Sequence, residues 1–258
     1  MEVQKQVRKS KKKKILLLLI AIISILVLLV AVSVYFFQFN PTGYRMSVPY
    51  RSSFEKISYN VYSNKNYSKD TETVNKIIES AKDRVRAFWG ELQCEDNTVI
   101  IICDDDKLIS KLGGDKNTVT TFFPSKQNYI SVSDEYFNID ILAHEITHAE
   151  LHTRLSEKAL QNIPTWFDEG IALQNDYREQ YSETQWIAQT DNGKNIVDVE
   201  DMDTPSEFYA GTAQDRRFRY LNAKHEVSEW LKVHHKQGLL TFLDELNSGE
   251  DFYTTYGR

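Results

Sequence analysis

The longest apolar pattern in the chain is an uncharged run from Ile15 to Phe37. At the rise of an α-helix, about 1.5 Å per residue, this run exceeds the hydrocarbon thickness of a bilayer, which is about 30 Å. Tyr35, Phe36 and Phe37 at its end are aromatic residues of the kind enriched at membrane interfaces. The pattern therefore predicts a transmembrane anchor over residues 15–37.

Residues 1–14 form a basic tail with seven of the 31 Lys and Arg residues of the chain. Basic flanks stay in the cytoplasm, so we expect a single-pass protein of the cell membrane whose later residues lie outside the cytoplasm. Ala31-Val32-Ser33 also offers small residues for signal-peptide cleavage. The apolar run is long for a signal peptide and continues past that point, which favours an uncleaved anchor.

After the anchor, residues 38–53 contain Pro41, Gly43 and Pro49 and are typical of a linker. The following segments alternate between strand and helix patterns. We expect strands at residues 54–62, 99–102, 118–123 and 129–133, and helices at 71–89 and 104–112, with Asp70 or Thr71 capping the longer helix.

From Asn138 onward the pattern is mainly helical, with Ile139, Leu142, Ile146 and Ala149 on one side of a helix that runs to about residue 155. Further helices are expected at 165–173, 215–233 and 239–246, with a last turn at 252–256 and a polar loop or insertion at 176–211. Together these patterns predict an α+β domain over residues 54–258, with a small mixed sheet and helices followed by a mainly helical half.

Charge is distributed unevenly along the chain. Residues 15–258 carry 24 basic and 36 acidic residues, a net charge of −12, which does not suit a protein that binds nucleic acid. The acidic surface mainly favours solubility, and a preference for basic substrates is a weaker interpretation. We therefore expect no nucleic-acid partner.

Two cysteines, Cys94 and Cys103, flank the predicted strand at 99–102. Nine residues of extended chain would hold them too far apart for a disulfide, unless the chain turns near residues 95–97. Both a single bridge and two free thiols remain open, and neither thiol is expected to have a catalytic role.

The strongest chemical signal is the sequence His144-Glu145-Ile146-Thr147-His148, which lies within the predicted helix from Asn138. Residues four apart share one face of a helix, so His144 and His148 can present two imidazoles to one cation. A carboxylate beside a zinc-bound water can take its proton, which gives Glu145 the place of a general base. The H-E-x-x-H arrangement is typical of zinc hydrolysis of peptide bonds.

A catalytic zinc site normally takes a third protein ligand. His152 continues the same face, but it lies eight residues from His144, about 12 Å along the helix axis, which excludes it and favours a partly exposed surface histidine. Glu169 is a better candidate, because it lies on a separate helix next to Gly170 and among apolar residues that predict burial. A buried carboxylate needs a cation or hydrogen-bond donors.

The two segments H-E-I-T-H and W-F-D-E-G-I-A together resemble the gluzincin metallopeptidases, in particular the small peptidase-MA-like domains with a W-x-x-E-G-x-A second motif. The resemblance implies a zincin-like fold, zinc bound by His144, His148 and Glu169, and Glu145 as general base. It also implies that Asp168 orients a ligand histidine, although Leu173 stands where other gluzincins carry a further acid.

Similar domains also carry a tyrosine that donates to the developing oxyanion, in a Y-x-x-A-x-x-V-x-x-L helix. Tyr220 nearly matches that place, with His225 and Tyr209 as rivals. The resemblance further implies an edge strand that pairs with the substrate backbone before the motif helix. That place is occupied here by Asn128, Tyr129, Ile130, Ser131, Val132 and Ser133.

The sequence thus predicts a membrane-anchored zinc metallopeptidase that hydrolyses a peptide or protein substrate outside the cytoplasm. The alternative is a catalytically inactive sensor or binding domain on a gluzincin scaffold. A structural zinc site fits poorly, because such sites normally use four protein ligands and more cysteine.

Overall fold

The structure is a computed structural model that describes residues 1–114, 119–122 and 127–257, without the side chains of residues 2–13 and 119–122. Its centre is a mixed five-stranded sheet with the strand order β1-β2-β3-β5-β4. Strands β2, β3 and β5 are parallel to one another, whereas β1 and β4 at the two edges are antiparallel to their neighbours. The strands are β1 (Phe54–Ser58), β2 (Val61–Asn64), β3 (Thr98–Cys103), β4 (Val119–Phe122) and β5 (Asn128–Ser133).

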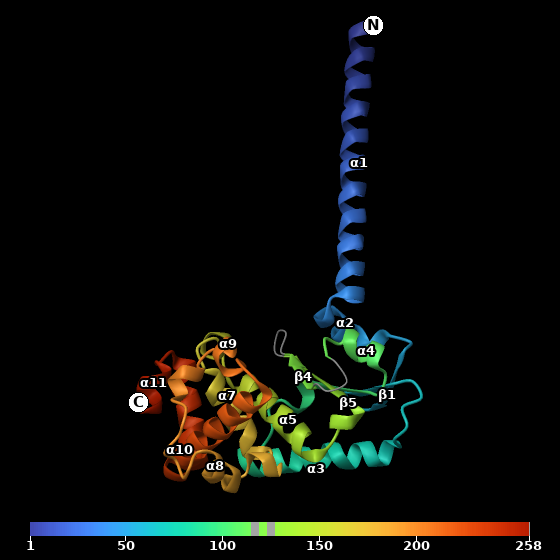
Figure 1. Ribbon diagram of the computed structural model, residues 1–258. Coiled ribbons are helices and arrows are strands. Elements are labelled where there is room, and N and C mark those ends of the chain that lie inside the picture. The colour runs from blue at the N-terminus through green and yellow to red at the C-terminus, as the bar shows by residue number, and fades with distance from the viewer. Residues whose placement is uncertain (115–118, 123–126, 258) are drawn as a thin grey trace.

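Helices surround this sheet and continue beyond it as a helical half (Figure 1). They are α1 (Glu2–Phe39), α2 (Pro41–Ser47), α3 (Thr71–Trp89), α4 (Asp106–Lys111), α5 (Ile139–Arg154), α6 (Glu157–Leu160), α7 (Thr165–Ala172), α8 (Glu183–Gln189), α9 (Pro205–Phe208), α10 (Ala213–Ser248) and α11 (Phe252–Tyr256). The prediction of a mixed α and β domain with a helical second half is confirmed. The break expected between residues 233 and 239 lies inside α10, where His235 has a non-helical backbone with φ of 57°.

The sheet separates two apolar cores. The larger core joins one face of the sheet to α3, α5 and the helical half, and the smaller core joins the other face to α2 and α4. Cys94 belongs to the larger core and Cys103 to the smaller one, and both are buried free thiols. The two cysteines therefore form no disulfide.

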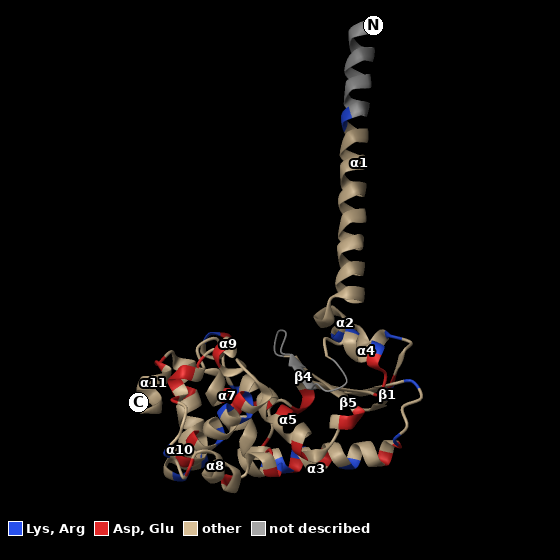
Figure 2. Cartoon of the chain, viewed as in Figure 1, with Lys and Arg blue, Asp and Glu red and all other residues tan. Residues whose placement is uncertain are grey.

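The apolar run near the N-terminus is helical throughout. Lys14–Phe39 is long and apolar enough to cross a membrane, and the apolar side chains in this span are exposed rather than packed against the domain. Figure 2 shows that this helix carries no charged residue between Lys14, which is blue, and α2. The backbone of the basic tail continues the same helix, since α1 begins at Glu2.

The expectation of a linker over residues 38–53 is wrong. Asn40 ends α1 and at the same time caps α2, whose Tyr44 and Arg45 are buried in the smaller core together with Val48 of the following 3₁₀ turn. Of the residues that predicted a linker, Pro41 instead begins α2, Gly43 forms its close contact with α1, and Pro49 lies in the 3₁₀ turn. This segment belongs to the folded domain.

Two further strand predictions need correction. The single strand expected at 54–62 is the hairpin β1–β2, because Asn60 adopts a positive φ of 56° at its turn. The strand Asn128–Ser133 was expected at an edge, but β5 pairs with β3 on one side and β4 on the other. The edge on this side of the sheet is β4, which pairs antiparallel with β5. A further strand was predicted at 118–123, and its two end residues lie outside the described residues.

Candidate metal centre

Helix α5 brings two histidines to one buried face. Asn138 caps the helix by accepting a hydrogen bond from the backbone N–H of Ile141 at 3.0 Å. His144 and His148, one turn later on the same side, are only 8% and 9% exposed. Their Nε2 atoms lie 3.1 Å apart. The sequence interval thus produces the paired imidazoles that it predicted.

Helix α7 supplies the third side chain, Glu169. It packs so closely on α10 that a Cβ atom at Gly170 would lie 2.6 Å from the carbonyl oxygen of Ala223 and from Cγ2 of Val227. This contact seats α7 between α5 and α10 and places Glu169 against the two histidines. The close approach requires the absence of a side chain at Gly170.

The three side chains form a nearly equilateral triangle of donor atoms. Oε2 of Glu169 lies 3.4 Å from Nε2 of His144 and 3.5 Å from Nε2 of His148. In a tetrahedral zinc site with bonds of about 2.0–2.2 Å, ligand atoms lie about 3.3–3.6 Å apart. The buried His144, His148 and Glu169 group could therefore hold a metal ion, with its donor atoms already at the required separation.

The hydrogen bonding of Glu169 also indicates that this group could hold a metal ion. Its Oε1 accepts a hydrogen bond from the hydroxyl of Tyr209, whereas its Oε2 is buried and has no hydrogen-bond partner among the described residues. A buried carboxylate oxygen without a partner is unfavourable unless a cation is present. The orphaned oxygen is the one that faces both histidines, so a cation there would satisfy it.

Asp168 is bonded to His148 and, through its other oxygen, to His152. Oδ1 of Asp168 lies 2.6 Å from Nδ1 of His148, which leaves Nε2 directed to the triangle. Oδ2 of Asp168 lies 2.6 Å from Nε2 of His152. These contacts are shorter than the separation of ligands around one metal ion, so they are hydrogen bonds rather than a second coordination group.

His152 is partly exposed, as predicted, but its side chain is only 13% exposed and is bonded to Asp168, which the sequence did not indicate. Helix geometry correctly separated His152 from the metal group. It could not show the bond to Asp168, because that bond joins α5 to α7. His152 thus supports the site indirectly, through the carboxylate that orients His148.

Burial and charge act in opposite directions on this cluster. Burial favours the neutral forms, but the neighbouring carboxylates of Asp168 and Glu169 outweigh it and raise the pKa of His148 well above its usual value. In the same way the two histidines outweigh burial and lower the pKa of Glu169 to about 2. His152 and His148 hold the pKa of Asp168 below its usual value. The carboxylates therefore require a positive charge beside them, which a metal ion or a proton on His148 would supply.

The sequence did not identify the acid that faces His144. Oδ2 of Asp176 lies 3.8 Å from Nδ1 of His144, and Asp176 is fully buried. Arg178 holds this carboxylate through its guanidinium and its backbone N–H, and Lys224 donates to the backbone carbonyl of Asp176 at 2.8 Å. Asp176 lies seven residues after Glu169, at the start of a segment expected to be a polar loop. The sequence offered one signal of a buried role, the basic residue Arg178 two positions later, with which Asp176 is paired in the structure.

Glu145 lies beside the triangle and is partly exposed. Its carboxylate raises the pKa of two tyrosine hydroxyls, Tyr209 and Tyr220, although burial and Glu169 have larger effects on both. The general-base candidate therefore lies near both tyrosines. Helix α10 carries Tyr220, whose ring packs on Tyr181 and Phe208.

His225, the other rival for the oxyanion donor, lies elsewhere. Its Nδ1 lies 3.2 Å from a carboxylate oxygen of Glu183, and its ring stacks on Trp186 with centroids 3.4 Å apart. These contacts hold His225 of α10 against α8. The structure therefore leaves Tyr209 and Tyr220 as the two candidates near the metal group.

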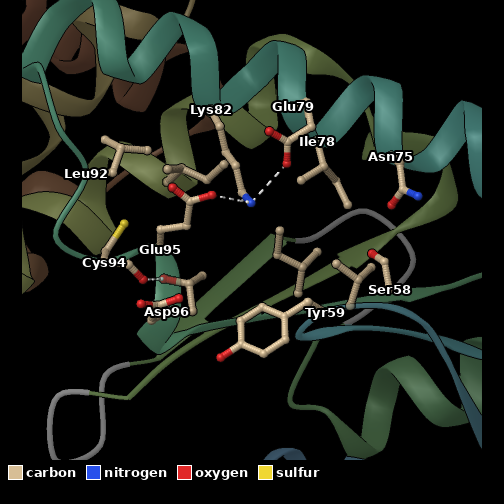
Figure 3. A pocket seen from close by; sticks show the side chains of 14 residues that line it. Ser58, Tyr59, Asn75, Ile78, Glu79, Lys82, Leu92, Cys94, Glu95 and Asp96 are labelled. Atoms are coloured by element: carbon tan, nitrogen blue, oxygen red, sulfur yellow. Dashed lines mark hydrogen bonds and ion pairs between the residues drawn. The ribbon is translucent and has the colours of Figure 1, made fainter.

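A separate cavity of about 470 Å³ lies between α3 and the sheet. Figure 3 shows its rim, where Lys82 is bonded to Glu79 at 3.1 Å and to Glu95 at 3.0 Å. Ile146 lines this cavity from the motif helix, but none of the three residues of the metal group does. We assign the chemistry to the triangle and not to this cavity.

No protein-family model matches the chain, and no curated protein is significantly similar to it in sequence. The interpretation of the site therefore depends on the geometry and chemistry of its own residues.

Proposed function

We propose that this protein is a zinc-dependent metallopeptidase of the gluzincin type. The observation that carries the proposal is the buried triangle of His144, His148 and Glu169, with donor atoms 3.1–3.5 Å apart and one orphaned carboxylate oxygen. Two imidazoles and one carboxylate are a donor set typical of catalytic zinc, which leaves a coordination position for substrate or water. Glu145 next to this set provides the base that peptide hydrolysis needs.

When bound, zinc would polarise the scissile carbonyl and make a water molecule more acidic. Glu145 takes a proton from the attacking water and then delivers it to the leaving amine. Tyr220 or Tyr209 donates a hydrogen bond to the oxygen that becomes negative in the transition state. Asp168 and Asp176 keep the imidazoles of His148 and His144 in position.

A peptide substrate would enter as an added strand. Because β5 is internal to the sheet, the free edge beside α5 is that of β4, which contacts α5. Pairing with the β4 edge would use main-chain hydrogen bonds and so accept many sequences. The apolar span and its basic N-terminal flank support a membrane anchor with the domain outside the cytoplasm.

The decisive experiment measures metal content and cleavage of an unfolded protein by the full-length chain in detergent micelles. We expect one zinc ion per chain and zinc-dependent cleavage. Glu145→Gln should retain zinc but lose turnover by about 10²–10⁴-fold, because it removes the base and not a ligand. Glu157→Gln, at an exposed position of α6, is the matched control and should retain activity. Unchanged turnover in Glu145→Gln would refute the mechanism.

Glu169→Gln tests the ligand assignment separately. It should lower zinc occupancy strongly, because an amide is a poor replacement for an anionic ligand. Full zinc retention in this variant would indicate another ligand. Zinc binding by the natural protein without cleavage of any unfolded protein would favour a sensor or binding domain on the same scaffold.

A further inference from the structure

The joint between α1 and the domain contains no spacer. The backbone N–H of Asn40 donates to the carbonyl of Phe36 at 3.2 Å, and its side chain accepts from the N–H of Gly43 at 3.3 Å. One residue therefore ends the apolar helix and begins the first helix of the domain. A chain with a flexible juxtamembrane segment would lack this shared cap.

Two contacts fix the angle of this joint. A Cβ atom at Gly43 would lie 2.4 Å from the carbonyl oxygen of Phe36. The backbones of α1 and α2 are therefore too close at this point to accept a side chain. Arg51 donates to the carbonyl of Phe37 and, at 3.2 Å, to the side chain of Gln38. Its guanidinium also stacks 3.6 Å from the ring centre of Tyr44. The C-terminal end of α1 is thus bonded by a residue that follows α2.

Helix α2 is in turn part of the smaller core. Tyr44 and Val48 are 2% and 1% exposed, and Arg45 donates through Nε to the carbonyl of Leu112 at 2.6 Å. The sheet, α2 and α1 are therefore joined through buried contacts. The apolar span holds the domain in one orientation instead of tethering it loosely.

Exposed aromatic side chains mark the level of this joint. Tyr35 and Phe39 at the end of α1 are exposed, and Tyr50, directly after α2, is 90% exposed. Tyrosine and other aromatic residues with this placement are typical of the membrane–water interface. If α1 spans a bilayer, α2 and Tyr50 lie at the level of its headgroups.

Two elements next to the metal group lie on the side of the domain that faces this level. Figure 1 shows the domain extending across the end of α1, with β4 and α9 on its face turned toward α1 and with α3 and α8 on the opposite face. Both β4 and the end of α9 adjoin residues or helices of the site. Strand β4 contacts α5, and Tyr209, directly after α9, bonds to Glu169.

From this arrangement we infer that the substrates are the membrane-proximal segments of polypeptides anchored in the same bilayer. The inference rests on the proposed peptidase function. A rigid joint without a spacer keeps the site at a fixed, small height above the membrane. Segments at that height meet the site at high effective concentration, and segments held far above it do not reach it.

The test uses the full-length protein in liposomes with two single-span reporters. Both carry the same unstructured target segment, placed either directly after the span or behind a stiff spacer of 20 prolines, about 60 Å long. The natural protein should cleave the near reporter at least about tenfold faster than the far one. A 20-residue Gly/Ser insertion between Phe39 and Asn40 should reduce that preference to less than about threefold, since it gives the domain about 25 Å of freedom.

The same insertion after Ser10, on the other side of the span, is the matched control and should keep the full preference. Cleavage of a soluble unfolded protein by all three proteins verifies the peptidase activity independently. Capture of the reporters by a photo-crosslinker in the target segment, using Glu145→Gln, measures the same preference without turnover. Equal cleavage and equal capture of near and far reporters, or a preference that survives the insertion at Phe39, would overturn the inference. Loss of cleavage with retained near-selective capture would refute only the proposed chemistry.

Discussion

Oδ2 of Asp176 lies 3.8 Å from Nδ1 of His144, on the side of the imidazole opposite the metal group. This distance is too long for a hydrogen bond, and Nδ1 of His144 has no hydrogen-bond partner among the described residues. A small rotation or one bridging water would close the contact, and the carboxylate would then fix the ring and raise its basicity as a ligand. Asp176 itself is held by Arg178. His144 and His148 therefore each face their own aspartate, one in α7 and one just after the 3₁₀ turn that follows α7.

Asp176→Asn should weaken zinc binding by about 10–100-fold, because the neutral amide no longer supports His144. Competition with a fluorescent zinc chelator measures the dissociation constant. The control is Asp191→Asn, whose side chain is 66% exposed and bonded only to Lys194 among the described residues. Equal zinc affinity in Asp176→Asn and the natural protein would show that the 3.8 Å contact is not functional.

Gly170→Ala should destabilise the domain by about 1–3 kcal/mol, because its Cβ has no space against Ala223 and Val227 of α10. Urea unfolding followed by tryptophan fluorescence reports on the domain alone, since all four tryptophans follow the apolar span. Gly257→Ala is the comparison, because it meets no neighbouring atom and costs only its left-handed backbone, about 1–2 kcal/mol.

The variants should also differ in zinc affinity. Gly170→Ala moves the helix that carries Glu169, so zinc binding should weaken, whereas Gly257→Ala should leave it unchanged. Identical zinc affinity in both variants would mean that the contact between α7 and α10 does not position the ligand.

Tyr220→Phe and Tyr209→Phe separate the two candidates for the oxyanion donor. The tyrosine that donates in the transition state should lose about 10²-fold in kcat with little change in KM. Tyr209 also bonds to Glu169, so Tyr209→Phe should additionally change zinc affinity. Steady-state kinetics at saturating zinc distinguishes the roles. Tyr220 is refuted as the donor if Tyr220→Phe retains full kcat while Tyr209→Phe loses it.

The metal-free protein should be most stable in mildly acidic solution. The pKa of Glu169 is lowered to about 2, so its contribution to stability is complete above its ordinary pKa of 4.5 and is lost as pH falls toward 2. The pKa of His148 is raised above 6.5, so its contribution is complete below 6.5 and is lost as pH rises through the raised value. Urea unfolding in EDTA at pH 3, 5.5 and 8 should show the highest free energy of unfolding at 5.5.

Zinc should oppose the loss of stability that the metal-free protein shows as the pH rises. A ligand imidazole must be neutral, so zinc affinity should rise as pH increases above 6.5 and His148 releases its proton. Zinc-loaded protein should therefore gain stability over metal-free protein more strongly at pH 8 than at 5.5. An identical gain at both pH values would contradict a role of His148 as a ligand.

The sequence alone determined the elements whose signals are local. Periodicity and the cap at Asp70 fixed α3, and the uncharged run fixed the apolar part of α1. Helical spacing brought His144 and His148 to one face, and apolar neighbours indicated the burial of Glu169. Each of these predictions depends on contacts between residues close in the chain, or on burial that composition already reveals.

Only the tertiary structure decided which distant segments meet. It placed β4 at the edge instead of β5, folded the expected linker into the smaller core, and turned His152 toward Asp168. It also brought Asp176 to His144. These outcomes depend on strand neighbours and on partners for buried polar groups, and neither leaves a periodic trace in the sequence. A strand pattern fixes which side chains are buried but not which strand lies beside it, because backbone hydrogen bonds are the same for every partner.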